Sequence, residues 1–327
     1  MLQDVSFVGG SYFLSANLQS CKSKINRLMN HISRIIIRIT ALFFEKALFS
    51  LLYVTSWKKD TIQTNLNYTQ INVIADKESF YRQLVRNLAH HVSEIIFDFG
   101  TFKKLPNELT RYPVRVGGTD YAIAPQSEVV LKKMQKGGIF LTAHYGNYEA
   151  MGPWLCRLGI PLKASYIPLK PAWLNRIVEN RIRSVNGKPY SINARTPREF
   201  LELLDSQNLF CLLMDQDSRI PSATTGNFLG HDVHVNPLPG FLLRHRPNTP
   251  VFICWIEESR NSKTLHAIEV EHDCDRRFWI ESGMTEAESV ADIFNQWLEK
   301  QILDKPALWY GWTHRRFFST APNLYQK

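Results

Sequence analysis

The chain has 327 residues, of which 44% are hydrophobic and 21% charged, a balance close to the globular average that excludes a disordered chain, a collagen-like fibre and a coiled coil. Lys and Arg number 39 against 30 Asp and Glu, and the net charge of +9 favours acidic partners such as nucleic acid, anionic lipid or an acidic carrier protein. Five scattered cysteines without a C-x-x-C pair indicate buried thiols in a reducing compartment, not a disulfide framework or a zinc site.

The segment 28–57 is strongly apolar and predicts a helix that associates with a membrane. Four of its residues recur at helical spacing and would form one narrow polar stripe: Arg34, Arg38, Ala41 and Glu45. Charged residues interrupt the apolar run too early for a spanning helix to be favoured, so a helix lying in the membrane interface fits better. The alternative is a buried helix of a soluble core. No secretory signal is visible in the first twenty residues.

Helical and strand-like patterns alternate along the rest of the chain. Apolar residues at helical spacing predict a helix over 77–99, which Asp76 can cap and Gly100 can end. Further helices are expected at 147–158, 171–183 and 285–302, and strands at 114–116, 138–142, 162–167, 209–214, 250–256 and 264–270. The patterns Thr196–Glu199 and Thr285–Glu288 are typical of capping boxes.

This alternation predicts an α/β fold with a mostly parallel central sheet flanked by helices. The membrane-associating segment is expected to cover 1–59, and the folded domain 60–327. Ligands of such sheets bind outside the carboxyl ends of the strands. The residues that directly follow the strands 138–142 and 209–214 are therefore the first candidates for a functional site.

His144 and Glu149 follow the first of these strands. A histidine held by a carboxylate can act as a general base, because the carboxylate fixes one imidazole tautomer and stabilises the imidazolium. On a regular helix five residues differ by about 140° of rotation, so the side chains can meet only if His144 lies in the turn before the helix. About one such pair is expected by chance, and the chain holds a second, His266 with Glu271, inside a predicted strand. The pattern alone leaves catalysis and a structural histidine equally open.

The residues around this pair resemble a known family. GGIFLTAHYGNYEAMG (137–152) is similar to the first block of the lysophospholipid acyltransferase superfamily, whose hallmark is H-x4-D/E. The closer similarity is to its bacterial lipid A biosynthesis branch, the lauroyl and myristoyl acyltransferases. Four further blocks resemble that branch in the same order: 170–187, 212–219, 224–252 and 309–317. The resemblance implies that 60–327 is an acyltransferase domain with a glycerolipid acyltransferase-like fold.

The resemblance also implies an activity: a membrane-associated O-acyltransferase would move a fatty acyl group from an acyl-carrier-protein or coenzyme A thioester to a hydroxyl of a lipid A precursor. His144 would be the general base and Glu149 its orienting partner. No cofactor beyond this thioester co-substrate is expected, and no metal, because no cluster has the spacing of metal ligands. The implied location is the cytoplasmic face of the bacterial inner membrane. The same chemistry on another acceptor, such as an aryl polyene, an ornithine lipid or a glycolipid, is the alternative.

Candidate contacts to the acyl donor follow from the second block and from the turn after His144. Arg181 is a candidate for contact with the oxyanion or the acyl donor, and the alternative is that it belongs to the solvated face of a helix. Main-chain N–H groups at Gly146 and Asn147 stand at the start of a predicted helix and are further candidates for the oxyanion. Asn147 is thereby a candidate substrate-binding residue.

Candidate contacts to the acceptor lie in two later blocks. Asp215 and Asp217 follow the strand 209–214 and are expected to order an arginine or the acceptor sugar, or else to cap a turn. Arg315 and Arg316 stand among aromatic residues of the last block. They are candidates for contact with a phosphate or headgroup, and the alternative is an aromatic cluster that packs the C-terminus on the core.

The expected partners are an acidic acyl carrier protein, an anionic lipid acceptor and the inner-membrane surface, all of which the positive charge would attract. A nucleic-acid-binding protein has only the charge and the scattered aromatics in its favour, since no motif or basic stripe is present. A non-catalytic scaffold is the third class, and the presence of both His144 and Glu149 argues against it.

Overall fold

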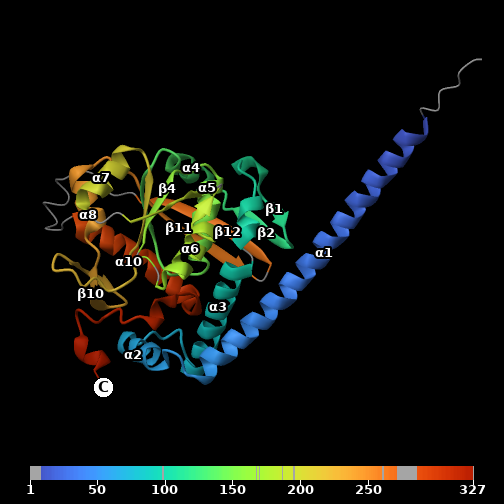
Figure 1. The fold of residues 1–327 in the computed structure, drawn as a ribbon. Coiled ribbons are helices and arrows are strands. Elements are labelled where there is room, and N and C mark those ends of the chain that lie inside the picture. Colours follow the sequence, from blue (N-terminus) through green and yellow to red (C-terminus); the bar gives the residue numbers. More distant parts are fainter. Residues whose placement is uncertain are drawn as a thin grey trace, which may run out of the picture.

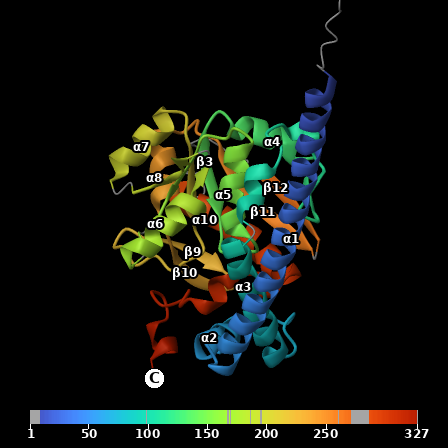
Figure 2. The same ribbon diagram turned by 45° about the vertical axis from the view of Figure 1, so that its right-hand side comes forward.

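A computed structural model describes residues 9–270 and 286–326, apart from 98, 167, 169, 186, 194, 195 and 260. Its first element, α1 (Gly9–Val54), is a long helix that packs on α3 (Lys77–Phe97) and runs away from the body toward its N-terminal end (Figure 1). The remaining elements form one α/β body, as the view turned by 45° shows (Figure 2).

The body is built on an eight-stranded sheet in the order β1-β2-β12-β11-β3-β8-β4-β7. In this order the strands are Val114–Val116, Thr119–Ile123, Ser262–Val270, Val251–Ser259, Gly138–Thr142, Leu209–Leu213, Leu162–Ser165 and Ser191–Ile192. β1 with β2 and β11 with β12 pair antiparallel, and the other neighbours pair parallel. The predicted α/β class with a mostly parallel sheet is therefore confirmed.

The sheet separates two apolar cores, because side chains alternate between its faces. Ile139 and Leu141 of β3 belong to the core that α3, α7 (Pro197–Asp205), α8 (Leu238–His245) and α10 (Glu286–Asp304) help to form. Phe140 lies in the opposite core with side chains of α4 (Ser127–Met134) and α5 (Tyr148–Arg157). The other described elements are α2 (Lys59–Thr69), α6 (Ala172–Arg181), the hairpins β5–β6 (Ser184–Val185, Lys188–Pro189) and β9–β10 (Thr224–Phe228, His231–Val235), and the 3-10 turns η1 (Phe99–Lys104), η2 (Leu109–Arg111), η3 (Pro306–Leu308), η4 (Tyr310–Thr313) and η5 (Pro322–Tyr325).

The predicted helices and strands are all present, and their bounds differ from the expected ones by a few residues, except that the N-terminal helix begins much earlier. The capping box at the start of α7 is formed: Thr196 Oγ1 accepts the N–H of Glu199 at 3.3 Å, and the Glu199 carboxylate accepts the N–H of Thr196 at 2.8 Å. The second predicted capping box begins at Thr285, which lies outside the described residues. Glu271 and the side chain of Arg34 also lie outside them.

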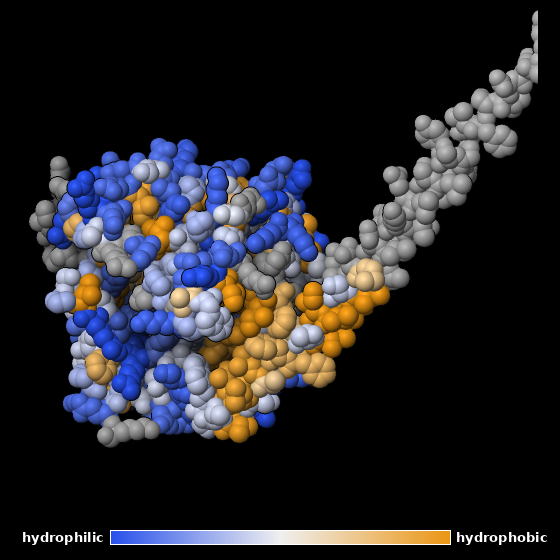
Figure 3. Space-filling model, in the orientation of Figure 1, coloured by the Kyte–Doolittle hydropathy of each residue, from blue (hydrophilic) through white to orange (hydrophobic). Residues whose placement is uncertain are grey.

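The polar stripe of α1 faces the body together with apolar side chains such as Phe44 and Phe49, and the rest of the apolar surface of the helix faces outward. Glu45 pairs with Nδ1 of His90 on α3 at 2.9 Å, and Ser93 of α3 donates to the carbonyl of Ala41 at 3.2 Å. Arg38 donates to a main-chain oxygen in the turn between β1 and β2. Large apolar side chains of the helix are exposed: Ile35, Ile36, Ile39, Leu42, Phe43 and Leu51. Figure 3 shows an orange band along the part of α1 next to the body, and this band continues onto the adjoining part of the body.

Among the described residues, no helix combines the length and the apolar character that crossing a membrane requires.

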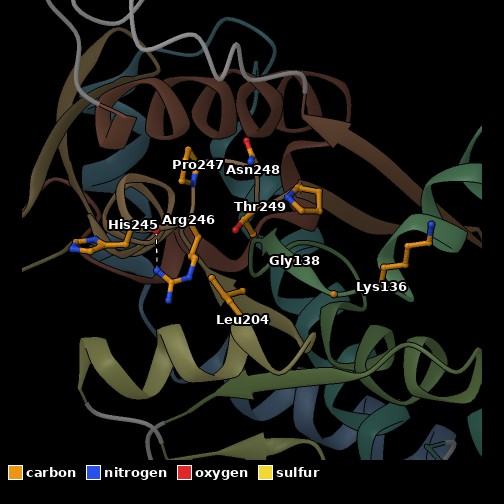
Figure 4. Close-up of a pocket in the computed structure, with 10 residues that line it drawn as sticks. Lys136, Gly138, Leu204, His245, Arg246, Pro247, Asn248 and Thr249 are labelled. Carbon is orange, nitrogen blue, oxygen red and sulfur yellow. Dashed lines mark hydrogen bonds between the residues drawn. The ribbon is translucent and has the colours of Figure 1, made fainter.

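A cavity of about 330 Å³ lies at the amino ends of the strands. Its lining includes Gly138, which begins β3, and the segment 245–250, which starts at the last residue of α8 (Figure 4). Arg246 in this lining is held by Asp205 of α7 through two nitrogens, each 2.7 Å from a carboxylate oxygen. The cavity is thus at the opposite edge of the sheet from His144, which follows the end of β3.

Candidate active site

The strands β3 and β8 bring two polar residues together at the carboxyl edge of the sheet. They pair in parallel with Thr142 opposite Leu213, and the N–H of Met214 donates to the carbonyl of Thr142 at 3.0 Å. His144 and Asp215 each come two residues after the end of their strand. Because the strands run in the same direction and in register, the two side chains meet.

Asp215 is fully buried and accepts three hydrogen bonds. Its Oδ1 lies 2.8 Å from Nδ1 of His144. Its Oδ2 accepts the main-chain N–H of His144 at 3.0 Å and the indole N–H of Trp309 at 2.9 Å. The imidazole is therefore held at one nitrogen. Its Nε2 has no hydrogen-bond partner within the described part of the chain, and 19% of the His144 side chain is exposed.

The C-terminal segment fixes the turn that carries His144. The N–H of Tyr310 donates to the carbonyl of His144 at 2.8 Å, and the N–H of Gly146 donates to the carbonyl of Leu308 at 2.9 Å. Gly146 has φ +56°, in the left-handed region that favours glycine, so the glycine permits the sharp turn into α5. The N–H of Gly146 is occupied by this bond, which corrects the expectation that it is available to an oxyanion.

Glu149 lies in the first turn of α5 and contacts an arginine. Its Oε1 is 3.0 Å from Nη2 of Arg183, and both side chains are about one-fifth exposed, at 18% and 19%. The guanidinium of Arg183 also lies 4.9 Å from the ring centroid of Tyr166. Glu149 was expected to orient His144, but the carboxylate bonded to the imidazole in the described structure is Asp215. The charge of Glu149 contributes to the raised pKa of His144.

The electrostatics of the pair favour a charged Asp215 beside a basic histidine. Burial alone would raise the pKa of the Asp215 carboxyl, but the neighbouring His144 and the hydrogen bonds from His144 and Trp309 hold that pKa well below its ordinary value. Burial lowers the pKa of His144, and the charge and hydrogen bond of Asp215, helped by the charge of Glu149, more than reverse this, so the net direction is upward. The site thus holds a fixed negative charge next to a titratable base.

Aromatic rings surround the imidazole. The Tyr148 ring lies edge-on to His144 with the centroids 4.9 Å apart, and the His314 ring centroid is 5.8 Å away. Behind Tyr148, the buried His91 lies between the rings of Tyr148 and Tyr310. Burial, and to a lesser degree nearby positive charge, lowers the pKa of His91 to about 3, so this ring is neutral at physiological pH. Asp215 and Glu149 are therefore the charged groups that dominate at His144.

Sequence comparison assigns the chain that carries this site to a family. The chain matches the model of the family described as bacterial lipid A biosynthesis acyltransferase over residues 34–319. The chain belongs to this family. It is therefore an acyltransferase, and the resemblance seen in the sequence blocks is confirmed. A search of curated proteins finds no match.

The acyltransferase uses two of the other predicted site residues in structural contacts. Asn147 is the N-cap of α5: its side-chain oxygen accepts the N–H of Ala150 at 3.3 Å, and its amide nitrogen donates to Glu94 at 2.6 Å. Asp217 accepts hydrogen bonds from Ser319 and pairs with Arg219 at 3.3 Å. Both side chains have protein partners, and a substrate contact by either of them stays a prediction.

The arginines proposed from the sequence are placed differently from one another. Arg316 is fully buried and donates to the carbonyls of Gln216 and His234 at 3.0 and 2.8 Å, so it packs the last block on the core, the alternative raised for it. Arg315 is exposed, with its guanidinium 5.8 Å from the ring centroid of Tyr325. Arg181 ends α6, and its side chain lies outside the described residues. A substrate contact by Arg315 or Arg181 stays a prediction.

Two residues of the acyltransferase site were not singled out from the sequence. Trp309 was grouped with the aromatics of the last block, and nothing in that pattern identifies its bond to Asp215. Arg183 lies two residues after Arg181 in the same block, and nothing in that pattern identifies its pair with Glu149. Across the described residues, no three His, Cys, Asp or Glu side chains gather closely enough to hold a metal ion.

Proposed function

We propose that the acyltransferase moves a fatty acyl group from an acyl-carrier-protein or coenzyme A thioester to a hydroxyl of a lipid A precursor, with His144 as general base. The observation that carries this proposal is the state of His144: one ring nitrogen is held by a carboxylate, and the other has no partner within the described part of the chain. A hydroxyl is a poor nucleophile until a base removes its proton, and this imidazole is arranged to do so.

In the proposed reaction, the imidazole of His144 first takes up a proton and then returns it. Nε2 of His144 takes the proton of the acceptor hydroxyl as its oxygen forms a bond to the thioester carbonyl carbon. The bond between that carbon and sulfur then breaks, and the imidazolium returns the proton to the leaving thiolate. The charges of Asp215 and Glu149 favour the imidazolium form between these steps. A cation such as Arg183 or Arg181 near the developing oxyanion would lower the barrier further.

The charge balance of the chain suits these substrates. Acyl carrier proteins are acidic and lipid A precursors carry phosphates, so a protein with a net charge of +9 attracts both, and it attracts an anionic membrane surface as well. The outward apolar surface of α1 supports association with that membrane, because the polar stripe of the helix is already used against the body. The proposed location is the cytoplasmic face of the bacterial inner membrane.

A reconstituted assay tests the proposal. Purified enzyme is mixed with acyl carrier proteins of several chain lengths or the matching coenzyme A thioesters, and with a lipid A precursor, and product masses are read directly. We expect one added acyl group on the precursor, and a loss of about 10²-fold or more in the His144→Ala variant. Acylation of an ornithine lipid or glycolipid with the precursor unchanged would reassign the acceptor. Full activity of His144→Ala would contradict the mechanism.

A further inference from the structure

We propose that Asp215 is the positioning residue of this site: it fixes the tautomer and orientation of His144, the role that the H-x4-E spacing assigns to Glu149. This inference rests on the proposed function, because it concerns the same base.

The hydrogen bonds of Asp215 determine which nitrogen of His144 carries the proton. Oδ1 lies 2.8 Å from Nδ1, and an ionised carboxylate can only accept. A neutral imidazole must therefore carry its proton on Nδ1, which leaves the lone pair on Nε2 to accept a proton from the substrate. The carboxylate itself cannot rotate freely, because its second oxygen is held by two N–H groups, the main chain of His144 at 3.0 Å and Trp309 at 2.9 Å.

Glu149 is not placed to do the same. It lies on α5, and its Oε1 is taken up by Arg183 at 3.0 Å. No hydrogen bond joins Glu149 to His144 among the described contacts, although its charge still raises the pKa of the imidazole. The two carboxylates thus act differently: Asp215 holds the ring, and Glu149 adds negative charge at longer range and holds Arg183.

The fold explains why Asp215 reaches the ring. His144 and Asp215 follow neighbouring parallel strands at the same register, so the contact depends on the sheet and not on the helix that follows. The side chains that face His144 from the surrounding elements are Asp215 after β8, Glu149 and Tyr148 on α5, His91 on α3 and His314 after η4. Of these, Asp215 is the one in direct hydrogen-bond contact with a ring nitrogen.

An amide at position 215 makes a sharp test. In Asp215→Asn, the two N–H groups that meet Oδ2 require an oxygen there, so the amide oxygen takes that place and the NH₂ group faces Nδ1 of His144. The NH₂ group donates to Nδ1, which must then give up its proton, and the proton moves to Nε2, where it blocks the base. The two N–H groups that meet Oδ2 keep an acceptor and the amide has the size of the carboxylate, so the variant should fold.

The measurement is ¹⁵N NMR of ring-labelled histidine in the full-length enzyme in detergent, with His144 assigned from the signal lost in His144→Gln. At the alkaline end of the titration we expect the Nδ1–H tautomer in the wild type and in Glu149→Gln, and the Nε2–H tautomer in Asp215→Asn. The acyl-transfer rate of Asp215→Asn should fall by about 10²-fold or more, as expected when a catalytic histidine is held in the wrong tautomer. Asp205→Asn, which alters the pair with Arg246 at the opposite edge, is the matched control and should change neither readout.

Several results would overturn the inference. They are a wild-type His144 in the Nε2–H tautomer, an Asp215→Asn variant that keeps the Nδ1–H tautomer, and a Glu149→Gln variant that switches it. The wild-type spectrum alone tests which nitrogen of His144 carries the proton, even if Asp215→Asn fails to fold. The tautomer is read without any acceptor, so this inference can fail while acyl transfer by His144 stands. Conversely, a correct tautomer without acyl transfer would count against the proposed function alone.

Discussion

At His144, two opposing effects set how basic the imidazole is. Burial favours the neutral ring, and the charge of Asp215 favours the imidazolium, with the second effect the larger. A general base must be neutral to act, so the reaction rate should fall as the pH drops through the raised pKa of His144. The position of that fall on the pH axis therefore reports the charge environment of the ring, and residues that touch Asp215 should move it.

Trp309→Phe tests this coupling by removing one donor to Asp215 while keeping an aromatic ring in the core. The carboxylate loses a bond that stabilises its charge, so it becomes a stronger partner for the imidazolium, and the fall in kcat/KM should shift to higher pH. Loss of a hydrogen bond to a charged group should also lower the free energy of unfolding by about 2 kcal/mol. A pH profile and urea denaturation measure the two effects.

Trp312→Phe is the matched control, because its indole donates to the carbonyl of Pro306 at 3.0 Å and not to a carboxylate. It should destabilise the fold, by about 1 kcal/mol, without moving the pH profile. Equal pH profiles for the two variants would contradict the coupling between Trp309 and Asp215.

The sequence predicts the place of these residues better than their partners. The strand ends put His144 and Asp215 at the same edge of the sheet, which is why both were candidates. Their pairing depends on β3 and β8 being neighbours in register, and strand order is not encoded in local periodicity. Spacing favoured Glu149 instead, because the pattern shows which residues are near in the chain and not that Arg183 holds this carboxylate.

At the level of elements, strong apolar periodicity predicts the helices and the buried strands. Short strands joined by turns with weak sequence signals are not predicted. The hairpin β9–β10 turns through Leu229 and Gly230, both with positive φ, as a two-residue hairpin turn requires. Asn or Asp is the usual signal at the first of these positions, so a leucine there conceals the turn. Phe228, at the end of β9, is fully buried, and Leu229 itself packs against the core.

A buried ion cluster joins three elements beside the site. Lys263 of β12 is 7% exposed and lies 2.8 Å from Glu94 of α3 and 2.5 Å from Glu258 of β11. Glu94 also accepts the amide of Asn147, the N-cap of α5. The lysine therefore compensates two carboxylates, one of which holds the start of the helix that follows His144.

Lys263→Met should be strongly destabilising, because it leaves Glu258 without the lysine that pairs with it and leaves Glu94 with the half-exposed His90, 3.6 Å away, as its remaining described ion-pair partner. Breaking a buried ion pair from one side costs about 3–5 kcal/mol. Glu94→Gln in the same background should restore part of this loss, since it removes one of the two carboxylates that lost the lysine. Urea denaturation of the two single variants and the double variant measures the coupling, and strict additivity would show that the cluster is not a unit.

At the scale of the whole molecule, the orientation of α1 on the body cannot be predicted from the sequence. The spacing of Arg38, Ala41 and Glu45 predicts a stripe but not which way it faces. In a water-soluble packing, the apolar surface of a helix turns toward the core. Here Glu45 and Ala41 bind α3 beside a few apolar side chains such as Phe44, and many other large apolar side chains of the helix are left outside. Such an arrangement is favourable where the surroundings of the helix are themselves apolar.

Vesicle binding tests this reading of α1. Ile36→Glu and Phe43→Glu together place two charges on the exposed apolar surface, while the contacts of the helix with α3 are untouched. Each removes a side chain whose burial is worth about 2 kcal/mol, so binding to vesicles of phosphatidylethanolamine and phosphatidylglycerol should weaken by about tenfold or more. Val129→Glu, at a 62% exposed apolar position of α4, is the matched control and should bind as the wild type does.

If the double variant also bound unchanged, the apolar surface of α1 would not be what holds the protein to the membrane, and the net charge would have to account for the attraction alone. Raising the salt concentration separates these two contributions, because screening weakens the charge term and leaves apolar burial in place.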